Sequence, residues 1–327
     1  MALDPELMRA FVAQIFQVFL VLAIAPLLLG VTRKVKARLL RRIGPTVWQP
    51  YRDLWKLMHK EAVLADNASW LYRSAPYMIF AATWIAAGLV PTYATGLLFS
   101  WAADLIAIVA LLATARFALS LAAMDVGTPF GGIGASREML IASLAEPAML
   151  LVVFTVALIA GTTQLSSIAT HMIEAQVGLR VSLGLGLIAF VFIAIAENAR
   201  IPVDNPATHL ELTMVHEAMV LEYSGRHLAM IEAAAALKLV TYFSLLICLF
   251  VPFGIATDAI VWDSATWPAL VIGLAAYFGK MLVLAALLPV GETMVAKMRV
   301  FRYPIFLGGA FAAAALAVFL LFVSQSF

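Results

Sequence analysis

Long apolar runs separated by shorter polar segments dominate the pattern of the chain. Eight runs approach or exceed the roughly 20 residues that a helix needs to cross about 30 Å of hydrocarbon. They lie at about 11–31, 77–98, 101–124, 139–161, 181–197, 229–254, 267–289 and 305–324. Stretches such as FVFIAIAEN are apolar on every face, and the alternation typical of β-barrel strands is absent. The pattern predicts a single all-α, polytopic membrane domain over residues 1–327, with about eight transmembrane helices.

The composition excludes a soluble globular protein. Hydrophobic residues make up 64% of the 327 positions and charged residues 12%, whereas soluble domains carry about 25% charged residues. Cys248 is the single cysteine, so neither a disulfide scaffold nor a cysteine-ligated Fe–S cluster fits this chain. The segment HEAMV at His216 lacks the second histidine of a zinc-protease motif. We therefore expect no metal and no cofactor in this chain.

Positive charge is distributed unevenly among the predicted connections. Sixteen of the 21 Lys and Arg residues fall in four segments, at about 32–76, 125–138, 198–228 and 290–304. The other side of the predicted bundle carries only Arg9 and Arg180. Positive charges that flank transmembrane helices tend to stay in the cytoplasm. We therefore expect these four loops to be cytoplasmic and both termini to lie outside.

The first cytoplasmic loop contains the amphipathic segment QPYRDLWKLMHKEAV. Leu54, Trp55 and Met58 recur near helical spacing on the side opposite Arg52 and Lys56. This pattern predicts a helix lying at the membrane interface. The ten positive charges of the loop favour contact with anionic lipid, and a docking surface for a soluble partner is a second interpretation that is compatible with the first.

Four ionisable residues lie well inside predicted spans: Arg116, Glu146, Lys238 and Lys280. Each costs about 2.5–3.5 kcal/mol at a helix centre, so these side chains must pair or face water. Counting about 1.5 Å per residue from the cytoplasmic ends places all four roughly 10–14 Å deep, in one layer. Glu197 and Glu232 continue this layer toward the cytoplasm. The layer favours a hydrated path of charged groups, and the alternative is a set of ion pairs that only fixes helix register.

The connection after the fifth span is rich in carboxylates. It holds Glu197, Asp204, Glu211, Glu217, Glu222 and Glu232. If the residues after Pro206 are helical, Glu211 and Glu222 fall on one face. Carboxylates crowded at a partly buried surface have raised pKa values, which suits a proton carrier near neutral pH. A solvated acidic face is the alternative interpretation.

Three stretches of the chain resemble a known family. They are RRIGPTVWQPYRDLWKLMHKEAV, ASREMLIASLAEPAML and AENARIPVDNPATHLELTMVHEAMVLEYSGRHLAMIE. Their GP…QP…D…KL…KE block, the Arg137 and Glu146 pair, and the ENxRxPxD and EYSG motifs are similar to subunit 1 of respiratory complex I, in which the insert between GP and QP is longer. Only Thr46, Val47 and Trp48 separate GP from QP, and ELTMVHEAMVLEYSG resembles the hydrogenase-type version. The chain thus most resembles the membrane subunit of group 4 [NiFe]-hydrogenases, as in formate hydrogenlyase and hydrogenase-4.

The resemblance implies a non-redox subunit of a multi-subunit oxidoreductase in the bacterial or archaeal cytoplasmic (inner) membrane. Such a subunit anchors soluble hydrogenase-type large and small subunits, which carry Fe–S clusters and a [NiFe] centre, and connects them to antiporter-like membrane subunits. The chain is not expected to be catalytic alone or to bind nucleic acid.

The candidate residues fall into three groups. The family match assigns a proton path to Glu146, Glu197, Asp204, Glu211 and Glu222. The argument from burial alone adds five further residues to this proton path, namely Glu217, Glu232, Arg116, Lys238 and Lys280. The residues expected to face the soluble arm are Arg42, Asp53, Lys56, Glu61, Arg137 and Arg200.

Two other functions fit the same sequence. One is a quinone-binding subunit 1 of an NADH dehydrogenase-type complex. The other is a static membrane anchor whose charges only hold helices together. The leading hypothesis is that redox chemistry in the arm changes carboxylate pKa values and so moves protons, or sodium ions, into the membrane domain.

Overall fold

The computed structural model describes residues 5–174, 180–204, 214–257, 266–295 and 302–325, and no β-strand occurs among them. Eight helices of these segments have 17 residues or more. They are α1 (Pro5–Leu39), α3 (Trp70–Leu89), α4 (Leu105–Asp125), α5 (Pro129–Ala160), α7 (Val181–Glu197), α10 (Gly225–Phe250), α11 (Thr266–Met294) and α12 (Tyr303–Gln325). Shorter elements are α2 (Gln49–Met58), η1 (Ser100–Ala102), α6 (Leu165–Glu174) and α9 (His216–Val220).

Length and apolar composition confirm an all-α, polytopic membrane protein. Among the described residues, six helices are long and apolar enough to cross a membrane, namely α1, α4, α5, α10, α11 and α12. The 17-residue α7 is a shorter apolar helix. Helix α3 overlaps the remaining predicted span, 77–98, over residues 77–89.

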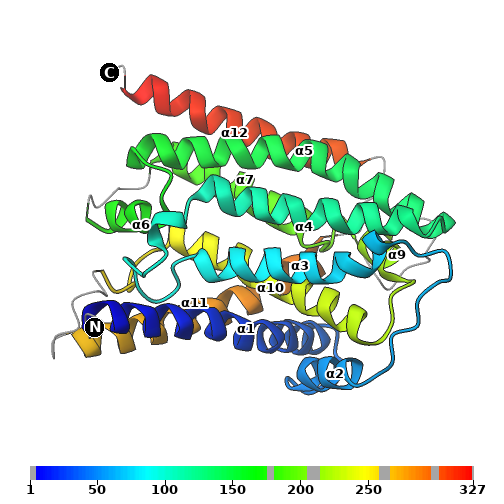
Figure 1. Cartoon of the computed structure of the whole chain (residues 1–327). Helices are drawn as coiled ribbons and strands as arrows, with labels where there is room; N and C mark the ends of the chain where they lie inside the picture. The colour runs from blue at the N-terminus through cyan, green and yellow to red at the C-terminus, as the bar shows by residue number, and fades with distance from the viewer. Residues whose placement is uncertain (1–4, 175–179, 205–213, 258–265, 296–301, 326–327) are drawn as a thin grey trace.

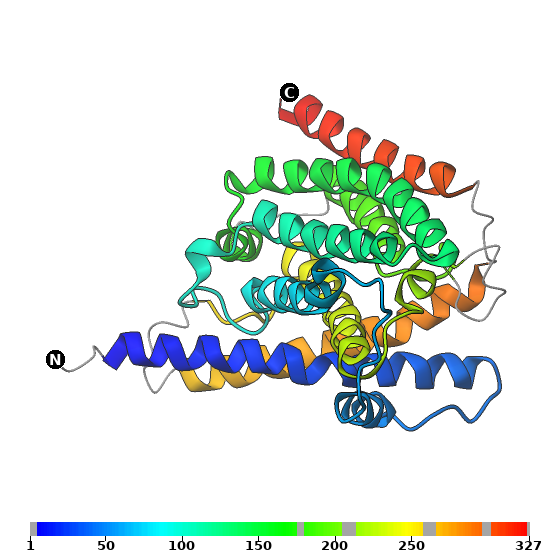
Figure 2. The same ribbon diagram turned by 45° about the vertical axis from the view of Figure 1, so that its right-hand side comes forward.

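The long helices lie side by side in one bundle, with α2 and α9 at one end (Figures 1 and 2). Helix α1 begins and α12 ends at the opposite end (Figure 1). Helix α10 is central, since 72% of its most apolar window is buried, against 28% for α11 and for α12. We call the end that carries α2 and α9 the α2 end.

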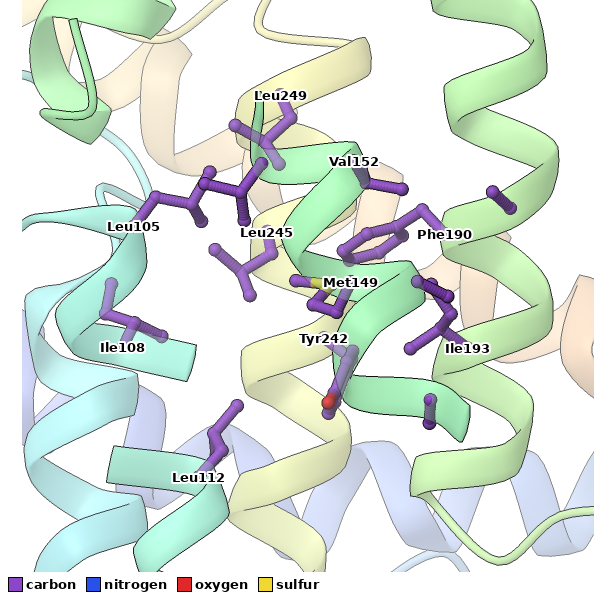
Figure 3. Packing of buried hydrophobic residues seen from close by; sticks show 14 of the residues in the cluster. Leu105, Ile108, Leu112, Met149, Val152, Phe190, Ile193, Tyr242, Leu245 and Leu249 are labelled. Carbon is purple, nitrogen blue, oxygen red and sulfur yellow. The ribbon is translucent and has the colours of Figure 1, made fainter. Parts of the chain in front are cut away.

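The core between α4, α5, α7 and α10 is apolar and well packed (Figure 3). Its buried side chains include Leu105, Met149, Phe190, Tyr242 and Leu245. In a bilayer the lipid is as apolar as leucine, so close packing rather than removal from water holds such helices together. Alanines buried in the same cluster allow the backbones to approach closely.

Several helix boundaries differ from the sequence-based expectation, and two of them have a local cause in the sequence. Helix α5 begins at Pro129 instead of about 139, because the Thr128 hydroxyl accepts a hydrogen bond from the amide of Gly131 and proline suits the first helical position. Most of the expected loop at 125–138 is therefore helical. Helix α3 ends at Leu89 instead of about 98, because Pro91 favours the extended conformation found at Val90 (φ −71°, ψ 123°).

The amphipathic helix expected after the first span is confirmed as α2. Proline at its start is compatible with helix initiation. The Tyr51 hydroxyl donates to the carbonyl of Ala23 and so joins α2 to α1. Trp55 and Met58 remain exposed, which leaves an apolar surface beside α1 for a membrane interface or a partner protein.

Candidate functional site

Four charged side chains from four helices meet in the interior of the bundle. Arg116 of α4 forms ion pairs with Glu197, the last residue of α7, and with Glu146 of α5. The Nζ atom of Lys238 on α10 lies 3.0 Å from Oε2 of Glu197. We call these residues the ion cluster. The structure thus brings together three of the four intramembrane charges and Glu197, as the depth count suggested.

Pairing explains how these charges are tolerated. Arg116 is 6% exposed and Glu197 is 8% exposed, and a buried charge is stable only when other groups compensate it. The guanidinium has five N–H donors, so it can serve two carboxylates at once. Glu197 in turn is held by two cations, Arg116 and Lys238. Neutralising one member consequently changes the environment of the other three.

The ion cluster extends from the interior to the side of the bundle. The side chain of Glu146 is 44% exposed, whereas that of its partner Arg116 is 4% exposed. A half-exposed carboxylate on a membrane-spanning helix is expensive in lipid. Glu146 therefore marks a place where a neighbouring subunit or water contacts α5.

A small cavity, the core cavity, adjoins the ion cluster on the side of the α2 end. Its volume is about 70 Å³, and its lining includes Arg116, Glu138, Glu197, His216 and Lys238. This space is large enough for a few water molecules, and its polar groups give those waters partners. The core cavity can therefore relay a proton between side chains that do not touch.

Glu138 was missed by the sequence analysis. It lies one residue before the span predicted at 139–161, in a segment that was expected to be a loop. The signal that could have found it is the Thr128–Pro129 pair, a helix start signal that places Glu138 inside α5. Neighbouring Arg137 donates to the Met214 carbonyl over 3.0 Å.

A larger cavity, the acid cavity, follows at the α2 end. It has a volume of about 250 Å³. Its ionisable lining consists of Arg33, Lys36, Arg200, Asp204, His216, Glu217, Glu232 and Glu292. His216 and Asn198 line both the acid cavity and the core cavity. His216 therefore stands at the boundary between the two spaces.

Burial and neighbouring charges shift the pKa values of two groups of the acid cavity in opposite directions. Burial, assisted by the charge of Lys238, lowers the pKa of His216 to about 4. Burial raises the pKa of Glu217, and the neighbouring carboxylates Glu232 and Asp204 add to this shift against the effect of Arg33. At neutral pH, His216 is therefore uncharged and Glu217 has an increased affinity for a proton.

Glu292 of α11 is a second residue that the sequence analysis missed. It is buried, and its carboxylate lies 2.6 Å from Nζ of Lys36 and 3.7 Å from Nη1 of Arg200. The predicted span ended at 289, but α11 passes through Pro289 and ends at Met294. Glu292 joins α11 to α1 and to the segment that follows α7.

A third cavity, the α2 cavity, lies between α1, α2 and α10. It has a volume of about 210 Å³ and is lined in part by Asp53, Arg33 and Glu232. Arg33 and Glu232 also line the acid cavity. Ionisable residues therefore line a series of adjoining spaces from α2 to the ion cluster.

Lys280 lies apart from the ion cluster, so the expectation of one layer with four members is wrong for this residue. Its ammonium group donates to the carbonyls of Val251, at 2.6 Å, and Phe253, just beyond the end of α10. Because α11 continues to Met294, Lys280 lies about 21 Å from that end rather than roughly 10–14 Å. There it binds the carbonyls of the residue that caps α10 and of the connection that follows.

The acid-rich segment is described only in part. Asp204 is buried, and its Oδ2 accepts hydrogen bonds from the amides of Val215 (3.2 Å) and His216 (3.1 Å). Glu222 is exposed beyond α9. Glu211 lies outside the described residues, as does the expected helix after Pro206 as far as residue 213. In the described remainder, α9 is helical over His216–Val220 and ends before Glu222.

The residues expected to face a soluble arm separate into two groups. Arg42, Lys56 and Glu61 are exposed near α2, and Asp53 accepts from the Gln49 amide at 2.8 Å. Arg137 and Arg200 instead make contacts within the chain. Docking itself stays a prediction for all six. Within the described residues, no group of three or more His, Cys, Asp and Glu side chains is arranged to hold a metal ion.

Comparison with known proteins identifies the family. A family model described as NADH dehydrogenase matches residues 12–323. The chain belongs to the NADH dehydrogenase subunit 1 family. It is 32% identical to hydrogenase-4 component C of Escherichia coli K12 over 86% of this chain and 87% of that protein. It is 31% identical to formate hydrogenlyase subunit 4 of the same organism, over 87% and 90% of the two chains. The predicted similarity to the hydrogenase branch of the family is thus confirmed.

Relatives in NADH-oxidising complexes are also similar, at lower identity and coverage. NADH-ubiquinone oxidoreductase chain 1 of Triticum aestivum is 29% identical over 63% of this chain and 66% of that protein. The fold is also that of a chain in an archaeal respiratory membrane complex, the membrane-bound sulfane sulfur reductase. That chain matches with a TM-score of 0.73 at 22% identity, over 97% of this chain and 99% of its own length.

Proposed function

We propose that this subunit 1 family member is the non-redox coupling subunit of a hydrogenase-type membrane complex. It anchors soluble electron-transfer subunits at the α2 end, which faces the cytoplasm, and conducts protons toward neighbouring membrane subunits. Its partners are hydrogenase-type large and small subunits, which carry the Fe–S clusters and the [NiFe] centre, and antiporter-like membrane subunits. The complex lies in the cytoplasmic membrane of a bacterium or archaeon.

One observation carries this proposal: ionisable residues line adjoining cavities from the α2 end to the ion cluster, whose member Glu146 lies at the side of the bundle. The route begins with Asp53 and Glu232 in the α2 cavity and continues past Glu217 in the acid cavity. It then passes His216, which lines two cavities, and reaches the ion cluster. Charged groups inside membrane proteins commonly mark ion pathways.

The mechanism is electrostatic. A change of charge in the docked arm alters the proton affinity of Glu217 and Glu232, whose pKa values respond to nearby charges. A proton that reaches Glu197 weakens the attraction of Glu197 for Lys238 and Arg116, both of which now pair with it. Arg116 then binds Glu146 more strongly. The redistribution of charge thereby reaches Glu146, where the route meets the side of the bundle.

Substitution Glu146→Gln tests this proposal. Because the carboxylate is half exposed, its replacement leaves no buried charge without a carboxylate partner, as Arg116 keeps Glu197. We expect an assembled complex that moves fewer protons per turnover, measured in inverted vesicles with a pH-sensitive dye. Glu174→Gln is the matched control, since Glu174 is an exposed carboxylate at the end of α6.

Other outcomes would support the competing functions. Reduced assembly with normal coupling in the remaining complex indicates a static anchor. An assembled Glu146→Gln complex with wild-type proton movement contradicts the coupling role. Reduction of a soluble quinone by the purified wild-type complex, inhibited by filling the α2 cavity through Leu57→Trp, supports a quinone-binding subunit.

A further inference from the structure

A fourth cavity, the lateral cavity, lies between α7, α10, α11 and α12 and plays no part in the proposed route. Its volume is about 550 Å³, within the range of about 300–1,000 Å³ that is typical of ligand pockets. Apolar side chains form most of its wall, including Phe192, Leu246, Leu284, Leu287 and Phe306. The cavity therefore suits an apolar ligand of considerable size.

Among the described residues that line the lateral cavity, charge occurs at one end only. The charged residues of this described lining are Arg200 and Glu292, both at the α2 end. Leu284 precedes Glu292 by eight residues of α11, so the apolar wall continues for about 12 Å from this charged mouth toward the middle of the bundle. A long apolar space with a charged mouth has the shape of a site for an amphiphile.

The mouth favours an anion. Glu292 is held by Lys36 at 2.6 Å, whereas its contact with Arg200 is longer, at 3.7 Å. Arg33 lies close enough to act electrostatically on Arg200. Glu292 is therefore shared between two cations, and the side chain of Arg200, the more loosely paired of the two and 22% exposed, retains N–H donors suited to a phosphate group.

We propose that the lateral cavity binds one acyl chain of an anionic phospholipid whose phosphate contacts Arg200. An apolar wall provides few hydrogen-bond partners for water, and the surrounding solvent of a membrane-spanning bundle is lipid. The lipid wedges between α11 and the α7–α10 pair and places its headgroup beside the Lys36–Glu292 ion pair. It thereby adds a specific contact to a region that the helices alone leave open.

The test measures phospholipid that stays with the full-length protein, purified together with its associated subunits and washed with detergent. Mass spectrometry of the extracted lipid should find about one retained anionic phospholipid per chain in the wild type, as expected for a single site. Leu284→Trp, which fills the cavity, should reduce this amount severalfold. Leu282→Trp is the matched control, because Leu282 lies two residues away on the exposed surface of α11 and should retain the lipid.

A second pair of variants makes the test independent of any single substitution. Leu246→Trp fills the cavity from α10 and should also release the lipid. Arg200→Gln should keep the acyl chain but lose the preference for anionic over zwitterionic headgroups. The proposal is overturned if the wild type retains no phospholipid, if Leu284→Trp and Leu282→Trp retain equal amounts, or if a prenylated quinone is extracted in place of phospholipid.

Discussion

The half of the bundle near α2 and the half away from it are built from the same long helices but differ in what fills the space between them. Near α2, ion pairs connect the helices, and ionisable residues line the cavities between them. In the other half, the same helices pack through Leu105, Phe190, Leu245 and Leu249 (Figure 3). The first half is arranged to respond to charge, and the second keeps the helices in fixed register.

The difference explains where charge is tolerated. In the α2 half, each cation of the ion cluster has a carboxylate partner on another helix. In the other half, Lys280 contacts backbone carbonyls near the end of α10. Carbonyl dipoles stabilise a cation, but they cannot take up a proton near neutral pH as a carboxylate can. Proton transfer is consequently expected only in the α2 half.

Removal of Arg116 should produce the largest effect. Arg116→Met leaves the buried carboxylate of Glu197 with Lys238 as its remaining partner, and breaking such a buried pair costs about 3–5 kcal/mol. We expect a much lower thermal unfolding temperature in detergent and no proton movement in any complex that remains. Arg180→Met, at an exposed cation before α7, is the control. If Arg116→Met is as stable as the wild type, the buried charge of Glu197 does not need Arg116 as a partner.

Leu245→Ala in the apolar half should cost less free energy and have a different consequence. The variant leaves a void among fully buried neighbours, and we expect a loss of about 2 kcal/mol, at the low end for such substitutions because lipid competes for apolar groups. Proton movement per turnover of the folded complex should stay normal. If coupling falls as far as it does for Arg116→Met, the two halves do not have separate roles.

The sequence predicts the fold well because the thickness of the bilayer fixes the length of an apolar run. The same regularity of helix rise predicts one depth for Arg116, Glu146 and Lys238, and these side chains meet in the ion cluster. It fails for Lys280, because the predicted span ends at about 289 whereas α11 continues through Pro289 to Met294. An error in a predicted helix end therefore gives an equal error in the estimated depth of each residue that is counted from that end.

Glu138 and Glu292 show why part of the site could not be predicted. Both lie just beyond the apolar runs, on helices that extend past the region in which hydropathy is informative. Their roles depend on contacts between distant segments, such as Lys36 with Glu292. Helix-capping signals can correct the helix ends, but the pairing across helices requires the three-dimensional arrangement.

The smallest predicted effect is on the pH dependence of stability, to which His216 and Glu217, adjacent residues of the acid cavity, contribute with opposite signs. Since the pKa of His216 is lowered to about 4 from an ordinary value of about 6.5, the unfolded chain binds a proton more readily, and this contribution to stability is lost as the pH falls. The loss should be about 0.7 kcal/mol between pH 7 and pH 6. Glu217, whose pKa is raised, has the opposite sign: its contribution is present at low pH and is lost as the pH rises through the folded value.

Thermal unfolding at a series of pH values should therefore separate the two groups. His216→Asn should become more stable relative to the wild type as the pH falls below 6.5, whereas Glu217→Gln should become more stable relative to the wild type as the pH rises. His59→Asn, at an exposed histidine of the α2 region, should follow the wild type. In the wild type the two contributions to stability partly cancel. Each single variant should therefore show a steeper dependence of stability on pH than the wild type, and the slopes of the two variants should have opposite signs. Parallel curves for both variants would show that neither group is buried in the assembled protein.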